Sequence, residues 1–416
     1  MENKTSIYVC VCCVLLLSVA CKGTVKKDSL LESNVECAAT QYRLQLDALG
    51  GGDRILIPRT VDADGKMTYA RRKWDWTIGF FPGSLWYLYN LTDDDYWKRQ
   101  AEKYTAYLEK EQYNTTHHDI GFVVGCSFLN GLRMGDRADY RQVVVQAAKS
   151  LSTRFRPDAG VIQSWNTDKG RPLERGWKCP VIIDNMMNLE LLFEATRLSG
   201  DSTYYKIAVS HADKTLRNHF RENGSSYHVV DYDPQTGNVL GRCTAQGYSD
   251  ESAWARGQAW AIYGYTMCYR YTHRPEYLRQ AQKVYEFIFT NLNLPDDLVP
   301  YWDYDALNIP NEPRDVSAAA ITASALYELS VYADDKEYKD TADKILEALS
   351  SPAYCAEVGE NHHFLLMHSV GSYPDHVEID VPLNYADYYY LEALKRKGDL
   401  EEQGNKRSFL TLVRRK

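Results

Sequence analysis

The chain has 416 residues, of which 44% are hydrophobic and 12% aromatic, and it carries a formal net charge of −8. Such a chain can bury a substantial core, either as more than one average domain or as one large domain built from repeats. The negative charge and the lack of a polybasic stripe argue against a nucleic-acid partner. An acidic substrate would therefore need local arginine or histidine side chains for its recognition.

The N-terminal 20 residues have the pattern of a secretory signal. Lys4 precedes the apolar run 7–20, which is short for a membrane span. Small residues at 18–20 precede Cys21 as in a bacterial lipobox, so we expect cleavage before Cys21 and a lipid on its sulfur. Cleavage by an ordinary signal peptidase is the alternative. The chain is thus predicted to be an exported lipoprotein of the periplasm, held at the outer membrane through its lipid alone, with residues 21–34 as a polar tether.

The cysteines beyond the proposed anchor are scattered along the chain. They stand at Cys37, Cys126, Cys179, Cys243, Cys268 and Cys355. Because none of them forms a CxxC or another zinc-like spacing, no metal site is predicted. Export would permit a disulfide bond, but the sequence does not indicate one.

Hydrophobic periodicity predicts about twelve helices along the rest of the chain. They lie near residues 35–49, 80–92, 94–110, 119–134, 136–153, 184–199, 201–220, 251–272, 274–291, 312–333, 335–350 and 381–396.

A short phrase recurs between these helices, in which a polar turn ends one apolar helix and an acid or arginine precedes a tyrosine that opens the next. Its five copies end at Tyr96, Tyr140, Tyr204, Tyr277 and Tyr338. Each copy is typical of the turn of a helical hairpin. Six hairpins would close into an all-α (α/α)6 toroid, because closure buries the ends that an open solenoid, the alternative, would expose. We predict one such catalytic domain over residues 35–400, followed by a basic tail at 401–416.

The loops that lead from one hairpin to the next carry most of the tryptophan, histidine, aspartate and glycine clusters, and they are expected to gather at one end of the toroid. The loops 160–177 and 227–247 are two of them. Aromatic side chains in such loops suit stacking on sugar rings, although most aromatic residues of the chain must belong to the core.

Two predicted helices begin beside a carboxylate. Asp184 follows the apolar residues 181–183, and Asp119 precedes the apolar run 122–132. Taken alone, Asp184 could equally be an N-cap that accepts backbone N–H bonds. Two buried acids near one another differ in pKa, so that one donates a proton at neutral pH while the other stays ionised. A helix N-terminus favours the anion, so burial or the partner acid must prevail if Asp184 is the donor.

Arg256 and Trp260 are four residues apart on the predicted helix 251–272 and therefore share a face. A guanidinium beside an indole suits a sugar carboxylate and its ring. Each residue alone is more often structural, as a buried arginine that satisfies carbonyls or a tryptophan in the core. His228 and the His117-His118 pair are weaker signals. No motif of a serine hydrolase, a P-loop or a dinucleotide site is present.

Several segments together resemble glycoside hydrolase family 88, the unsaturated glucuronyl hydrolases. They are Trp76-Thr77-Ile78-Gly79-Phe80-Phe81-Pro82-Gly83, His118-Asp119-Ile120-Gly121-Phe122, Ile183-Asp184-Asn185-Met186-Met187-Asn188 and Trp254-Ala255-Arg256-Gly257-Gln258-Ala259-Trp260. The similarity runs in order from about residue 40 to residue 396. The resemblance implies the six-hairpin toroid and action on the unsaturated uronic acid that polysaccharide lyases leave at a non-reducing end.

The resemblance also implies the chemistry and the residues. An acid protonates carbon 4 of the enol ether, water adds at carbon 5, and the hemiketal opens and expels the rest of the oligosaccharide. Asp184 matches the general acid/base and Asp119 the second carboxylate. The polar substrate contacts would be His118, His228, Gln246 and Arg256, and the aromatic walls Trp76, Phe80, Trp260 and Tyr373. Neither a metal nor an organic cofactor is implied, since one acid that gives a proton and takes one from water suffices.

Two other functions stay open at this level. An unsaturated rhamnogalacturonyl hydrolase would share the fold and the chemistry on pectin fragments. A non-catalytic glycan-binding lipoprotein would also be helical, aromatic-rich and anchored by a cysteine. The sequence specifies neither the glycan nor the oligomeric state.

Overall fold

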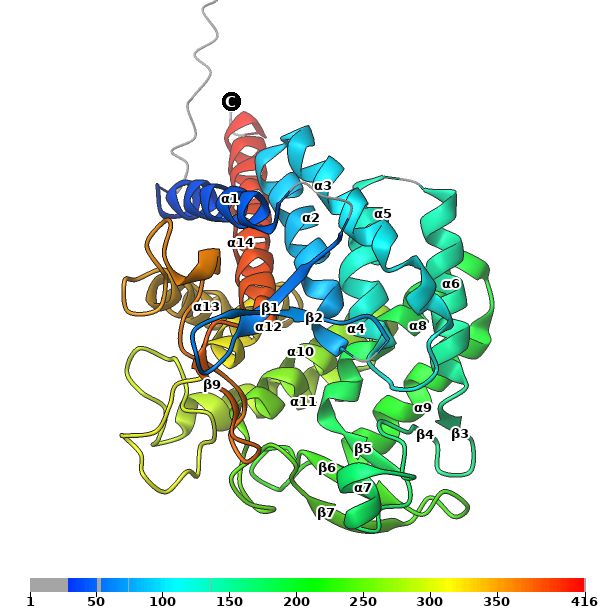
Figure 1. Cartoon of the computed structure of the whole chain (residues 1–416). Coiled ribbons are helices and arrows are strands. Elements are labelled where there is room, and N and C mark those ends of the chain that lie inside the picture. The colour runs from blue at the N-terminus through cyan, green and yellow to red at the C-terminus, as the bar shows by residue number, and fades with distance from the viewer. Residues whose placement is uncertain (1–28, 51–53, 74, 136, 415–416) are drawn as a thin grey trace, which may run out of the picture.

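The computed structural model describes residues 29–50, 54–73, 75–135 and 137–414, and it shows a closed ring of helices (Figure 1). The inner helices are α2 (Phe80–Thr92), α4 (Ile120–Val124) continued through a π-helical turn (Gly125–Leu129) into α5 (Asn130–Met134), α8 (Leu189–Ser199), α10 (Ala255–Thr272), α12 (Val316–Ala333) and α14 (Asn384–Arg414). Each inner helix packs on the next, and α14 packs on α2. The predicted (α/α)6 toroid is therefore confirmed, and the open solenoid is wrong because the two ends of the array meet.

A second layer of helices covers the ring. It consists of α3 (Asp95–Tyr107), α6 (Ala138–Ser152), α9 (Ser202–Asn218), α11 (Pro275–Thr290), α13 (Lys336–Leu349) and α1 (Ser29–Leu49). The outer helices are amphipathic: α13 buries Tyr338, Ala342, Ile345 and Leu349, which recur at three- and four-residue spacing. By contrast, α12 is buried at every position from 316 to 327 because helices surround it. Among the described residues it is the one helix apolar and long enough to cross a membrane.

The recurring phrase has a local physical cause. Asp94, Asp201 and Asp335 precede outer helices, and each side chain accepts a hydrogen bond from the backbone N–H two residues later, at 2.8–2.9 Å. The acid of the phrase is therefore an N-cap, which satisfies an amide that the helix leaves unpaired. Tyr277 is fully buried in the turn. Cap and tyrosine together explain why the hairpins could be located from the sequence.

Short antiparallel strands and helical turns fill the connections between hairpins. The strands are β1 (Ile57–Val61) with β2 (Met67–Ala70), β3 (Phe155–Arg156) with β4 (Val161–Ile162), β5 (Pro180–Ile182) with β6 (Val229–Tyr232) and β7 (Val239–Cys243), and β8 (Ser369–Ser372) with β9 (Val377–Val381). The helical turns are η1 (Trp76–Gly79), η2 (Glu109–Tyr113), α7 (Gly170–Glu174), η4 (Ile183–Asn188) and η5 (Asn361–His363). Strands β3 to β7 lie together at one end of the toroid (Figure 1), as the clustering of loops predicted.

One carboxylate on α14 joins several inner helices at the centre of the ring. Glu392 is buried and accepts hydrogen bonds from Tyr87 of α2 at 2.6 Å, Tyr263 of α10 at 3.0 Å and Ser324 of α12 at 2.6 Å. Arg396 lies one turn further along α14, 3.5 Å from the same carboxylate. Because a buried charge is costly without such partners, this network fixes how the inner helices meet.

The ends of the chain differ from the prediction. Helix α1 begins at Ser29, so the expected tether 21–34 is wrong for its last six residues, where Leu31 already packs against the core. The described part of the expected basic tail, residues 401–414, continues α14, and Lys397 pairs with Glu401 across the expected boundary at 3.0 Å. The proposed signal and Cys21 lie outside the described residues.

Candidate active site

Strand pairing places Asp184 beside His228. Strands β5 and β6 pair in antiparallel register, and the N–H of Ile183 extends the ladder by donating to the carbonyl of His228 at 3.0 Å. The next residue, Asp184, lies in the 3-10 turn η4 and is 8% exposed. Its Oδ2 is 3.7 Å from His228 Nε2 and has no hydrogen-bond partner among the described residues. Because Asn188 is the residue that precedes α8, Asp184 is not the helix cap that its sequence position also allowed.

Burial gives Asp184 the pKa of a neutral-pH acid. Desolvation raises the pKa of its carboxyl to about 7, with a further increase from the charge of Asp119. Arg256 and Trp260 oppose this increase without cancelling it. A carboxyl whose pKa matches the working pH is present in both protonation states, which is the requirement for giving and taking a proton.

The second acid, Asp119, stays ionised. Burial alone would raise the pKa of its carboxyl, but His118, His117 and Arg154 lower it below the usual value. Oδ1 of Asp119 lies 3.3 Å from His118 Nε2, and Oδ2 lies 3.6 Å from His117 Nδ1. The two acids are therefore driven apart in pKa by their surroundings, and Asp184 is the one of the two that can hold a proton at neutral pH.

Hydrogen bonds fix the tautomer of His118. Oδ1 of Asn188 accepts from the N–H of Phe122 at 3.0 Å, so its amide nitrogen faces His118 Nδ1 at 3.3 Å. An amide nitrogen can only donate, so His118 carries its proton on Nε2, which faces Asp119. Burial lowers the pKa of His118 to about 4, which keeps the ring neutral at pH 7.

Hydrogen bonds also fix the tautomer of His228. Its Nδ1 accepts from the backbone N–H groups of Ala245 and Gln246, both at 3.1 Å. The proton therefore sits on Nε2, which faces Asp184. Burial holds the pKa of His228 well below its usual value. Each acid of the pair thus faces the N–H group of a neutral imidazole.

The guanidinium of Arg256 makes more hydrogen bonds to protein groups than the sequence suggested. Its Nη1 donates to Asp315 at 2.9 Å and to the carbonyl of Val370, and its Nη2 donates to the carbonyl of Gly371 at 2.5 Å. Only Nε is buried without a partner among the described residues. Most of this guanidinium is therefore bound to protein oxygens, as the structural interpretation of the sequence predicted, and it holds β8 in place. A sugar carboxylate would have to compete with these oxygens for the N–H donors.

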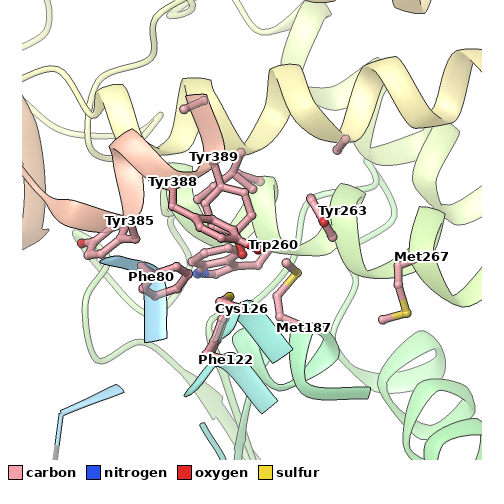
Figure 2. Close-up of a cluster of buried hydrophobic side chains, with 14 of the residues drawn as sticks. Phe80, Phe122, Cys126, Met187, Trp260, Tyr263, Met267, Tyr385, Tyr388 and Tyr389 are labelled. Atoms are coloured by element: carbon pink, nitrogen blue, oxygen red, sulfur yellow. The ribbon is translucent and has the colours of Figure 1, made fainter. Parts of the chain in front are cut away.

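Trp260 is fully buried and lies between aromatic rings of other inner helices (Figure 2). Its ring centroid is 5.2 Å from that of Phe122 and 5.5 Å from that of Tyr389. The indole N–H has no hydrogen-bond partner among the described residues, and the side chain is one of the groups that lower the pKa of Asp184. The indole thus lies in the interior next to the acid, with its N–H directed at no other described group but close enough to Asp184 to lower the pKa of that carboxyl.

The predicted aromatic walls divide into half-buried rings, Trp76 and Tyr373, and fully buried rings, Phe80 and Trp260. Trp76 is half-buried, and its ring is 5.5 Å from Phe80 and 4.9 Å from Tyr385. Phe80 itself is fully buried and is covered by Trp76 and Tyr385, and its expected place in a wall of the site stays a prediction. Tyr373 stacks on Trp302, with ring centroids 4.3 Å apart.

Gln246 connects two loops. Its side-chain amide donates to the carbonyl of Gly371 at 3.2 Å, the same oxygen that Arg256 holds. Gln246 and the end of β8 therefore lie together. Direct contacts of Gln246, Tyr373 and the other predicted substrate-binding residues with a sugar stay predictions.

The sequence missed several residues that shape the site. Trp254 lies 4.5 Å from the ring of His228, and Trp165 contacts the same ring edge-on at 6.2 Å and stacks on Trp177 at 5.9 Å. Asn188 stands four residues after Asp184, a helical spacing that could have indicated it. In the described part of the chain, no group of three or more His, Cys, Asp or Glu side chains is arranged to hold a metal ion.

Comparison with known proteins gives a consistent result. Residues 58–402 match the family model of Glycosyl Hydrolase Family 88. An unsaturated glucuronyl hydrolase of Formosa agariphila is 45% identical over 92% of this chain and 96% of the relative, and an unsaturated chondroitin disaccharide hydrolase of Streptococcus pyogenes is 34% identical over 89% and 93%. The crystal structure of an unsaturated glucuronyl hydrolase specific for heparin superposes with a TM-score of 0.85 at 43% identity, covering 90% of this chain and 98% of that one.

We expect His118 and His228 to stay neutral with the proton on Nε2 from pH 8 down to pH 5, because burial disfavours the imidazolium and Nδ1 of each ring accepts a hydrogen bond. Nitrogen NMR of the protein labelled at histidine would resolve the tautomers, with His118→Gln and His228→Gln identifying the two signals. Titration of either ring near pH 6.5 would contradict the assignment.

Proposed function

Because the chain belongs to glycoside hydrolase family 88, we propose that it is an unsaturated glucuronyl hydrolase. It removes the 4,5-unsaturated uronic acid from the non-reducing end of lyase-generated oligosaccharides by hydration of the enol ether. One observation carries this proposal: a buried carboxyl, Asp184, has a pKa of about 7 and an oxygen without a partner among the described residues, and it lies near an acid whose pKa is lowered.

The site accounts for each proton in such a reaction. Neutral Asp184 donates its proton to carbon 4 of the unsaturated ring, and positive charge develops at the ring oxygen and carbon 5. The resulting carboxylate then takes a proton from the water that adds at carbon 5, which restores the acid. The Nε2–H of His228 faces the carboxyl and can donate to it while it is ionised. The hemiketal formed by hydration opens and releases the remaining oligosaccharide.

This chemistry needs only one acid/base residue. Ordinary glycosidases place two carboxyl groups on either side of a glycosidic bond, one as acid and one as base or nucleophile. Here the surroundings keep Asp119 ionised, and its charge raises the pKa of Asp184. The second acid thus serves to keep the donor protonated and to accept hydrogen bonds from sugar hydroxyls.

We propose glycosaminoglycan fragments as the substrate class. The relatives act, by their names, on unsaturated glucuronyl groups, on chondroitin disaccharides and on heparin. Pectin-derived fragments, the substrates of the rhamnogalacturonyl alternative, have the same enol ether and are the second class to test. The glycan-binding alternative is disfavoured because an acid that is half protonated at neutral pH has no purpose in a protein that only binds.

The substrate proposal is tested with unsaturated disaccharides from chondroitin, hyaluronan and heparin, and with unsaturated pectin fragments, by following loss of the ultraviolet absorbance of the conjugated enol. We expect turnover on at least one glycosaminoglycan disaccharide. Asp184→Asn, which cannot donate the proton, should be slower by roughly 10²–10⁴-fold, the usual contribution of general acid–base catalysis.

Asp387→Asn is the matched control for this assay. Its carboxyl is also buried with a pKa raised to about 7, but its two oxygens accept from the backbone N–H groups of Leu365 and Leu366, each at 2.9 Å. We expect this variant to keep its activity if it folds. Equal losses in both variants would mean that Asp184 acts through stability, and no turnover by wild type on either substrate class would overturn the function.

We propose that the protein is exported and lipidated at Cys21, which would place it in the periplasm at the outer membrane. The support is the apolar run 7–20 and the small residues before Cys21. Labelled palmitate should be incorporated into the wild-type protein during growth, and Cys21→Ser should abolish the label. A labelled Cys21→Ser variant, or an unlabelled and soluble wild type, would contradict the anchor.

A further inference from the structure

One face of α1 is held against the segment that follows α13. Asn34 donates to the hydroxyl of Ser350 at 2.8 Å. Two turns later, the amide of Gln41 donates to the carbonyl of Glu360 at 3.1 Å and accepts from the N–H of Gly359 at 2.8 Å. These contacts recur at helical spacing, so side chains between them on the same face also meet this segment.

Cys37 lies between Asn34 and Gln41 on this face, and Cys355 lies in the facing segment. Each thiol changes the pKa of the other, so the two side chains face one another, and both residues are half-buried. The backbone around Cys355 is well defined, because its N–H donates to the carbonyl of Ser351 at 2.8 Å and it pairs with Leu366. We propose that Cys37 and Cys355 form a disulfide bond that joins the first helix to the loop after α13.

The other described cysteines do not share this arrangement. Cys126, Cys179 and Cys268 are buried, and burial raises the pKa of each thiol above its usual value. Cys243 is half-buried, but its thiol pKa is raised to about 11, mainly by burial. The neighbouring Cys355 instead lowers the pKa of the Cys37 thiol to about 7, which makes Cys37 the thiolate that attacks first.

The oxidation balances with a disulfide-bearing oxidant, either a thiol-disulfide oxidoreductase of the exporting compartment or glutathione disulfide. The Cys37 thiolate attacks one sulfur of the oxidant and displaces its other sulfur as a thiolate. Cys355 loses its proton and attacks the Cys37 sulfur of the mixed disulfide, which releases the second thiolate. Two protein thiols thus lose two protons and two electrons, and the oxidant becomes two thiols.

The bond would close a loop that includes most of the catalytic domain. Such a cross-link restricts the unfolded chain. It would also attach α1 covalently to the ring, directly after the segment proposed to carry the lipid. In the cell the bond rests on the proposed export, because disulfides persist in oxidising compartments. It does not rest on the catalytic proposal.

The first experiment tests whether the two thiols can pair in the folded protein, independently of whether the cell exports it. The full chain, purified under reducing conditions, is treated with glutathione disulfide, alkylated under denaturing conditions, digested and examined by mass spectrometry. We expect a peptide that joins Cys37 to Cys355 and a melting temperature about 2–5 °C above that of the reduced protein. Failure to form the linked peptide would overturn the proposal.

The variants control for other cysteines. Cys37→Ser and Cys355→Ser should each abolish both the linked peptide and the temperature difference, whereas Cys243→Ser should keep both. A difference in melting temperature between oxidised and reduced protein that persists in Cys37→Ser would count against the bond. Protein recovered from exporting cells without reductant should already contain the link. Free Cys37 and Cys355 in that sample would contradict the bond in the cell, whatever the activity on sugars.

Discussion

The site depends on the burial of a single carboxyl group without full hydrogen bonding. Asp184 and Asp387 are both buried, and burial raises the pKa of each to about 7. Backbone N–H groups occupy both oxygens of Asp387, which therefore serves to hold a loop. Oδ2 of Asp184 has no such partner among the described residues. Because ionisation in the interior is costly, Asp184 still holds a proton at a pH at which an exposed aspartate is fully ionised.

The two histidines beside the acids are held neutral by the surrounding fold. Strand β6 brings His228 to Asp184, and the N–H groups of Ala245 and Gln246 hold the imidazole in the tautomer that faces the acid. Asn188 does the same for His118. A charged imidazolium in either place would lower the pKa of the neighbouring carboxyl. The neutral rings therefore provide a donor at each acid without removing the proton-donor capacity of Asp184.

The sequence predicted what local chemistry determines and failed where distant segments decide. Aspartate caps such as Asp201 act within two residues, so the hairpins could be located and the toroid inferred. Asp184 and Asp119 could be found because each stands at a helix start. Helical spacing placed Arg256 and Trp260 on one face, but it could not show that Asp315 and the carbonyls of β8 would take up the guanidinium. Likewise, no local pattern distinguishes Phe80, covered by other rings, from an exposed wall.

The pH dependence of kcat/KM on an unsaturated disaccharide tests most directly whether Asp184 is the neutral donor. If it is, activity falls about tenfold per pH unit above a pKa near 7, as the carboxyl ionises. Asp119→Asn, which removes the charge that raises this pKa, should move the fall to lower pH, whereas Asp139→Asn, a change at an exposed residue, should not. Activity that stays constant to pH 9, or a fall that Asp119→Asn leaves in place, would contradict this role of Asp184.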